Sequence, residues 1–152
     1  MTHLGNAAAR QRVLQRIAAL KPETPARWGR MNAHQMLCHL ADSFRAVAGD
    51  KKVSPASGIM QRTVVKWAAL YLPMPWPKGV RTRPEVEQGA GGTPPTDFCR
   101  DRIELIHEIE RFADPNRKFA WHPHPIFGMM SERQWLRWGY LHADHHLRQF
   151  GA

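Results

Sequence analysis

Cysteine is scarce in this chain of 152 residues, which holds only Cys38 and Cys99. Two thiols cannot build the disulfide framework that a small secreted protein of this kind would need. The N-terminal segment also lacks the uninterrupted apolar stretch of a signal peptide, because charged side chains recur along it. These absences favour a protein that works in the reducing cytoplasm.

Long hydrophobic runs are also missing. No apolar stretch approaches the roughly 20 residues that cross a bilayer, so no membrane partner is expected. Hydrophobic residues nevertheless make up 43% of the chain, which is typical of a globular domain with a core. The length fits a single domain over residues 1–152.

Acidic residues are the minority charge. Lys and Arg number 22 against 13 Asp and Glu, a formal net charge of +9. This excess raises nucleic acid as a partner, but no run of five or six basic residues appears, which disfavours it. A solvated basic surface, or a pocket for an acidic small molecule, explains the charge as well.

Alternating strand patterns are absent, and helical periodicity dominates. Asn32 and Ser131 are good N-caps, and Ser131 with Gln134 forms a capping box. The third predicted helix gathers its large apolar residues on one side. The fold class is therefore all-α, a helical bundle. The predicted helices cover residues 5–20, 32–49, 58–72, 96–112 and 131–150, and the third carries Met60, Val64, Trp67 and Tyr71 on that side.

The segment 73–96 reads as a loop, because it concentrates proline and glycine. A structureless loop of this length is uncommon in a compact domain and is often functional. A mobile surface excursion is the equal alternative.

The last predicted helix carries a cluster of histidines. His142 and His146 are four residues apart, so they share one stripe at the rim of the helix's core face. His145 points away from that face, beside Trp138 and Leu141, where we expect it to pack against another helix or a dimer partner. A His-x-x-x-His pair is the usual way for one helix to offer two imidazoles to one metal ion.

A third ligand is needed for tight binding. His39 lies on the rim of the second predicted helix, whereas His34 falls on the opposite side of that helix. His39, His142 and His146 are therefore the three that can converge on one ion. The competing interpretation is that these rim histidines are only hydrogen-bonded.

Three further residues are candidates for lining the pocket. Gln35 and Ser43 share the stripe of His39, and Trp135 lies along the stripe of His142. An aromatic residue at helical spacing is more often part of the core, which is the alternative for Trp135. No catalytic base stands out.

Other potential ligands have weaker cases. Cys38 lies on the far side of its helix from the core face, and Cys99 is expected to be a small buried residue. His122 and His124 could approach the site from a loop, although histidines flanked by proline are usually structural or exposed.

The stretches "WGRMNAHQMLCHLADSF" and "HPIFGMMSERQWLRWGYLHADHHLRQFGA" resemble the DinB-like (DinB/YfiT) superfamily, in particular an uncharacterised branch that ends in a similar HHLRQFG pattern. The likeness covers about half of the chain, and its motifs are specific only in combination. It implies a four-helix bundle of up-down-down-up topology with a long crossover loop. It also implies a divalent metal held by His39, His142 and His146, with zinc or nickel favoured and manganese or iron compatible.

The resemblance further implies a metal-dependent enzyme, such as a transferase or isomerase that acts on a small-molecule substrate with a low-molecular-weight thiol. Homodimers are frequent in that superfamily. Three imidazoles leave a coordination position open, as catalytic metal sites do. The alternative function is a non-catalytic protein that binds a metal or a small ligand.

Overall fold

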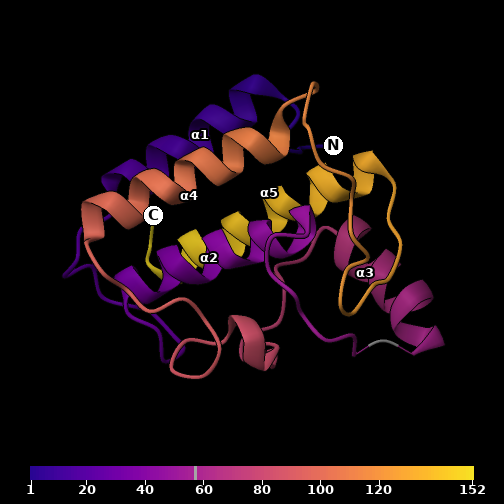
Figure 1. Ribbon diagram of the computed structural model, residues 1–152, viewed down its shortest axis with the longest axis horizontal. Coiled ribbons are helices and arrows are strands. Elements are labelled where there is room, and N and C mark those ends of the chain that lie inside the picture. The colour runs from indigo at the N-terminus through magenta and orange to yellow at the C-terminus, as the bar shows by residue number, and fades with distance from the viewer. Residues whose placement is uncertain (57) are drawn as a thin grey trace.

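The computed structural model describes residues 1–56 and 58–152, and within these ranges it is helical and has no strand (Figure 1). The predicted all-α class and all five predicted helices are confirmed. No helix in the described ranges is both long and apolar enough to cross a membrane. The elements in order are α1 (Ala7–Ala19), α2 (Ala33–Ala48), η1 (Gln61–Val65), α3 (Lys66–Tyr71), η2 (Pro84–Val86), α4 (Phe98–Ala113) and α5 (Glu132–Gln149).

Local hydrogen bonds set the starts of the long helices. At α2 the Asn32 side chain accepts from the Gln35 N–H and the Gln35 side chain accepts from the Asn32 N–H, a complete capping box. Ser131 begins α5 in the same way. Asp97, not Thr96 as predicted, caps α4, because its carboxylate reaches the free amides of the first turn.

The four long helices pack in two directions (Figure 1). Arg16, near the end of α1, pairs with Asp144, near the end of α5, at 2.6 Å, so these helices run the same way. Arg45, near the end of α2, pairs with Glu104 in the second half of α4 at 2.6 Å. Helices α2 and α4 therefore run together and opposite to the other two. This places the first half of α2 against the second half of α5.

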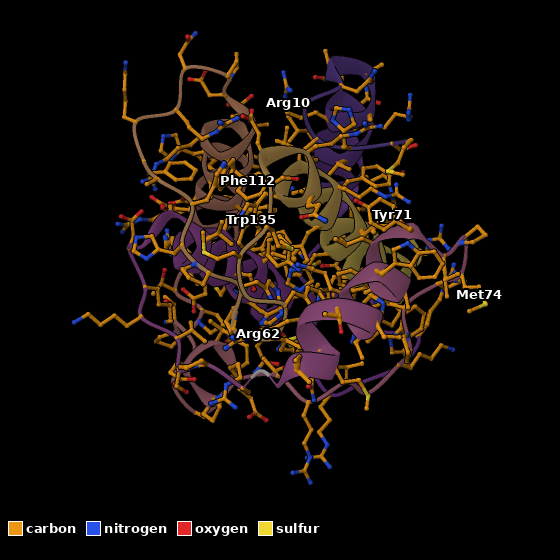
Figure 2. The ribbon with its side chains drawn as sticks, turned by 90° about the vertical axis from the view of Figure 1, so that its right-hand side faces the viewer. Arg10, Arg62, Tyr71, Met74, Phe112 and Trp135 are labelled. Carbon is orange, nitrogen blue, oxygen red and sulfur yellow. The ribbon has the colours of Figure 1, made fainter. Side chains whose placement is uncertain are left out.

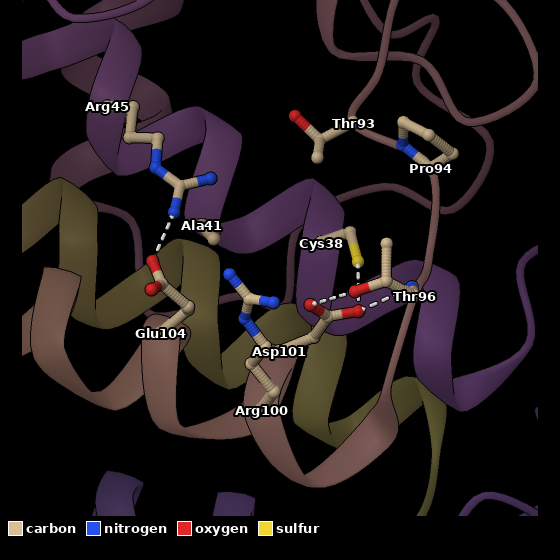
Figure 3. Close-up of a pocket in the computed structure, with 9 residues that line it drawn as sticks. All are labelled: Cys38, Ala41, Arg45, Thr93, Pro94, Thr96, Arg100, Asp101 and Glu104. Carbon is tan, nitrogen blue, oxygen red and sulfur yellow. Dashed lines mark hydrogen bonds and ion pairs between the residues drawn. The ribbon is translucent and has the colours of Figure 1, made fainter.

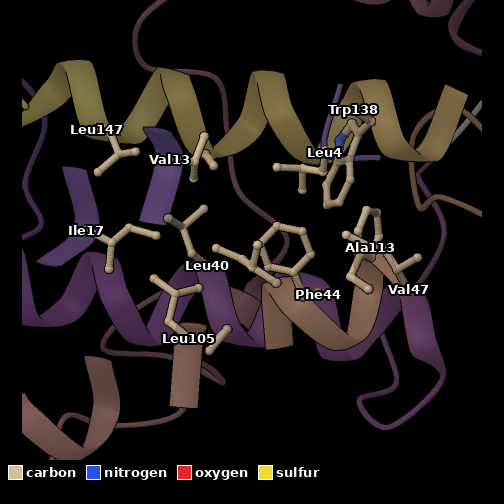
Figure 4. Packing of buried hydrophobic residues seen from close by; sticks show 14 of the residues in the cluster. Leu4, Val13, Ile17, Leu40, Phe44, Val47, Leu105, Ala113, Trp138 and Leu147 are labelled. Carbon is tan, nitrogen blue, oxygen red and sulfur yellow. The ribbon is translucent and has the colours of Figure 1, made fainter. Parts of the chain in front are cut away.

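The core lies between these four helices (Figure 4). Phe44 of α2 contacts two other rings edge to face, Phe112 at 4.9 Å and Trp138 at 6.0 Å between centroids. The predicted core face of α5 is buried at four of its positions, namely Leu136, Ala143, Leu147 and Phe150.

Trp138 corrects the helical-wheel prediction. It was expected on the outer side of α5 beside His145, but only 4% of its surface is exposed. Its ring packs on Phe44, and the ring of His124, from the loop before α5, lies 5.3 Å from it. The buried surface of α5 is wider than the predicted core face, because the loop before α5 covers a second side of the helix.

The apolar side of the third helix faces outward. Met60, Val64 and Trp67 expose 64%, 65% and 57% of their surfaces, whereas Leu70 is fully buried. Figure 2 shows Tyr71 and Met74 at the edge of the molecule, while Phe112 and Trp135 lie inside. Helix α3 thus buries Leu70, receives a hydrogen bond from Arg137 of α5 on the Leu70 carbonyl, and leaves Trp67 in solvent.

Candidate metal centre

Three histidines from two helices meet at one point. His39 comes from α2, and His142 and His146 come from successive turns of α5. One ring nitrogen of each lies within 4.8 Å of those of the other two. The ring centroids of His39 are 5.5 Å from His142 and 4.8 Å from His146. These side chains could hold a metal ion, and they are the three that the helical wheels selected.

Hydrogen bonds fix the orientation of two of these rings. His39 Nδ1 lies 2.8 Å from the carbonyl oxygen of Val86, and His146 Nδ1 lies 3.0 Å from Gln149 Oε1. Gln149 Nε2 in turn donates to the carbonyl of Trp28 at 2.7 Å, which turns its oxygen toward His146. Because both oxygens only accept, each Nδ1 carries the proton and each Nε2 keeps a free lone pair.

His142 completes the site from an aromatic environment. Its ring lies 4.9 Å from that of Trp138 and 6.0 Å from that of Trp76. Its Nδ1 atom is buried and has no hydrogen-bond partner in the part of the chain that the structure describes. A buried polar atom without a partner is costly and points to a ligand, water or ion.

The site favours neutral imidazoles. Burial lowers the pKa of His39, and it lowers the pKa of both His142 and His146 well below the ordinary value. Charge repulsion between the neighbouring rings lowers the pKa of His142 and His146 further. Neutral imidazole is the form that ligates a metal.

The loop 73–96 lies at the surface but contacts the three-histidine group. The buried Val86 of η2 supplies the carbonyl that orients His39. Thr93 donates its backbone N–H and its hydroxyl to the Asp42 carboxylate, each at 2.7 Å. Trp76 lies next to His142. The loop is therefore fastened to α2 and α5 at several points.

The three residues predicted to line the pocket make hydrogen bonds or packing contacts within the fold. Gln35 uses its side chain in the capping box of α2. The Ser43 hydroxyl is buried and donates to the carbonyl of His39 at 2.8 Å. Trp135 is 1% exposed and stacks on Trp121 in the core, with 5.9 Å between centroids.

His145 lies outside the three-histidine group, as predicted, but its surroundings differ from the prediction. Its ring lies 6.0 Å from Trp28 and 6.1 Å from Trp76. The same chain therefore covers this side of α5, where another helix or a dimer partner was expected. Both tryptophans stand in loops without periodicity, so no local pattern in the sequence signalled them.

The remaining candidates are separate from the three-histidine group. Cys99 is exposed, which corrects the expectation of a buried residue, and Cys38 is buried. His124 Nδ1 accepts from the backbone of Ile126 and Phe127, both at 3.1 Å, and burial lowers its pKa to about 3. His124 is thus a structural residue of the loop before α5.

One family model matches the chain. It is described as "Protein of unknown function (DUF1569)" and covers residues 6–152, which include all five α-helices and the three histidines. No curated protein and no solved structure matches the chain.

Proposed function

The chain belongs to the DUF1569 family, and from its three-histidine site we propose that it is a divalent-metal-dependent enzyme of the DinB-like type. One observation carries the proposal. His39 and His146 present free Nε2 lone pairs next to His142, whose buried Nδ1 has no partner in the described part of the chain. Such a group of buried neutral imidazoles fits a metal ion better than a hydrogen-bonded core.

The arrangement of the helices supports the DinB-like part of the proposal. Helices α1 and α5 run one way and α2 and α4 the other, with a long crossover between α2 and α4 (Figure 1). These helix directions support the up-down-down-up topology that the resemblance implies. One ligand from the second helix and two from the last also agree with it.

In the proposed reaction each residue has a defined task. His39, His142 and His146 would hold the ion, and the Val86 carbonyl and Gln149 orient two of the rings. Imidazole donors suit zinc or nickel as well as iron. A bound divalent ion with an open position lowers the pKa of a thiol or water and so supplies a nucleophile near neutral pH. We propose a small-molecule substrate and a low-molecular-weight thiol as the reactants.

A non-catalytic metal-binding protein is the second candidate. Its support is the aromatic wall, because Trp76 and Trp138 both lie against His142 and restrict access to that ring. This candidate requires the same three ligands but no turnover.

Elemental analysis of the untagged protein tests the metal site. We expect His39→Ala and His142→Ala each to bind about one divalent ion per chain fewer than the wild type. His145→Ala is the matched control, since it removes a neighbouring imidazole on the same helix and should keep the ion. A metal content of both ligand variants equal to that of the wild type, or no binding by wild type incubated with zinc or nickel, would contradict the proposal.

A thiol-conjugation assay on the metal-loaded protein separates the two candidates. Turnover that disappears in His39→Ala supports the enzyme. Stoichiometric metal without turnover across the common low-molecular-weight thiols supports the binding protein.

A further inference from the structure

A second group of potential ligands lies where α2 packs against α4. His34 and Cys38 come from α2, and Asp101 comes from the first turn of α4. One donor atom of each lies within 4.8 Å of those of the other two. His39, the α2 ligand of the three-histidine site, faces α5 instead, so the two groups use different sides of α2.

The spacing of the second group suits a tetrahedral ion. His34 and Cys38 are four residues apart, which places both donors on one stripe of α2. Bonds of about 2.0–2.3 Å put tetrahedral donors roughly 3.3–3.8 Å apart. The distance from Cys38 Sγ to Asp101 Oδ2 is already 3.6 Å. The distance from His34 Nε2 to the same oxygen is 2.7 Å. It must increase by roughly 0.6 Å for both atoms to bind one tetrahedral ion.

Neighbouring groups already hold the carboxylate in place. Thr96 donates its backbone N–H to Asp101 Oδ2 at 2.8 Å and its hydroxyl to Oδ1 at 3.0 Å. The aromatic ring of Phe98 lies edge-on to His34, with 5.3 Å between centroids. Such support of the ligands by a surrounding shell is what metal sites need.

A cavity of about 280 Å³ opens beside the group (Figure 3). Cys38 and Asp101 line it, together with Thr93, Thr96, Arg45 and Arg100. Figure 3 shows the Cys38 sulfur and the Asp101 carboxylate turned toward one another at its wall. The cavity has room for a water molecule as a fourth ligand.

We infer that His34, Cys38 and Asp101 form a second divalent metal site, which takes a borderline-soft ion such as Zn²⁺ and completes its coordination with water from the cavity. The thiol proton leaves to solvent as the sulfur–metal bond forms, and the His34 proton moves from Nε2 to Nδ1. The thiolate and the carboxylate together balance the two positive charges. No oxidation or reduction takes part.

Cobalt(II) is the probe that distinguishes this site from the three-histidine site. A thiolate bound to Co²⁺ gives a near-ultraviolet charge-transfer band, which a site made only of imidazoles cannot give. We expect the band in the wild type and in the His39→Ala/His142→Ala double variant. Cys38→Ser should abolish it, and Cys99→Ser, which removes the exposed cysteine, should leave it unchanged.

Two outcomes would overturn the inference: no thiolate band in the wild type at saturating Co²⁺, or a band that survives Cys38→Ser. Either would leave the group as a hydrogen-bonded contact between helices. If the double variant does not fold, the wild type and the two cysteine variants still decide. The three-histidine site can be tested separately in the Cys38→Ser background, which leaves its ligands unchanged. Elemental analysis should there give about one ion per chain, and its loss when His39→Ala is added.

Discussion

The partner of Nδ1 decides what each buried histidine does. In His39 and His146 this atom donates to an oxygen, which leaves the Nε2 lone pair free to bind a metal ion. In His124 the same atom accepts hydrogen bonds from two backbone N–H groups, so the ring stabilises the loop before α5. Identical side chains with similar burial therefore have different chemistry.

Gln149 should control the affinity of the three-histidine site. Gln149→Leu removes the acceptor that orients His146, so we expect metal affinity to fall about 10–100-fold while the helical content is kept. Competition with a chromogenic chelator measures this change. The matched control is Gln15→Leu, at an exposed glutamine of α1. Equal affinities of the two variants would exclude an orienting role for Gln149.

His124 should make the protein sensitive to acid. Burial lowers its folded-state pKa to about 3, while the unfolded chain titrates near pH 6.5. The unfolded state therefore binds more protons as the pH falls below 6.5, and stability is lost in that range. Between about pH 7.5 and about pH 5 this one group should cost about 2 kcal/mol.

His124→Asn provides the comparison, because its side-chain oxygen can accept the same two N–H groups without titrating. Urea unfolding at both pH values should show a smaller acid-induced loss in the variant, by about 2 kcal/mol. An identical loss in both proteins would rule out His124 as the source.

At the scale of elements, α2 is the helix that carries residues of both groups of candidate metal ligands. One side presents His39 to α5, and another presents His34 and Cys38 to α4. The capping box at Asn32 fixes where the helix begins, and Gly49 ends it with a φ of 87°. The ends of α2 thus set the register of both groups of ligands.

Gly49 should be intolerant of a side chain. A Cβ there would lie 2.3 Å from His122 Nε2, in addition to the strain of the left-handed backbone. We expect Gly49→Ala to lower the free energy of unfolding by about 2 kcal/mol, because the left-handed backbone is strained and the exposed His122 ring must also turn aside. Gly79→Ala is the control, since Gly79 has a φ of 73° but nothing within 4 Å, and it should cost only about 1 kcal/mol. Urea denaturation that finds equal losses would contradict the predicted clash.

At the scale of the whole molecule, the crossover 73–96 contacts both the helical bundle and the three-histidine group. The buried Asp42 carboxylate of α2 accepts from Thr93, near the end of the crossover, and pairs at 2.9 Å with Lys51, which lies just after α2. The same crossover supplies the Val86 carbonyl that holds His39. Attachment of the crossover and orientation of the His39 ring are therefore coupled.

Removing Asp42 should release the crossover. Asp42→Ala leaves Lys51 without this carboxylate, and we expect a loss of about 3 kcal/mol in stability and faster proteolysis within 73–96. Asp50→Ala is the control, because Asp50 pairs with Arg111 at the surface and should cost less than about 1 kcal/mol. Limited proteolysis and urea unfolding measure both effects, and an Asp42→Ala crossover as resistant as that of the wild type would contradict the coupling.

The sequence by itself determined the five helices, the capping residues Asn32 and Ser131, and the three histidines that lie together. These features follow from interactions within a few residues, since 3.6-residue periodicity places His142 and His146 on one stripe and side-chain caps begin helices locally. Thr96 shows the limit of this reasoning, because two neighbouring residues can both cap and only Asp97 does.

Only the tertiary structure decided what surrounds those helices. Trp28 and Trp76 cover His145, and Val86 holds His39 across the fold. These contacts join residues far apart in the chain, and their partners lie in loops that carry no periodic signal. The outward face around Trp67 has the same cause: periodicity groups apolar side chains on one side of a helix, but packing decides whether that side meets the core or the solvent.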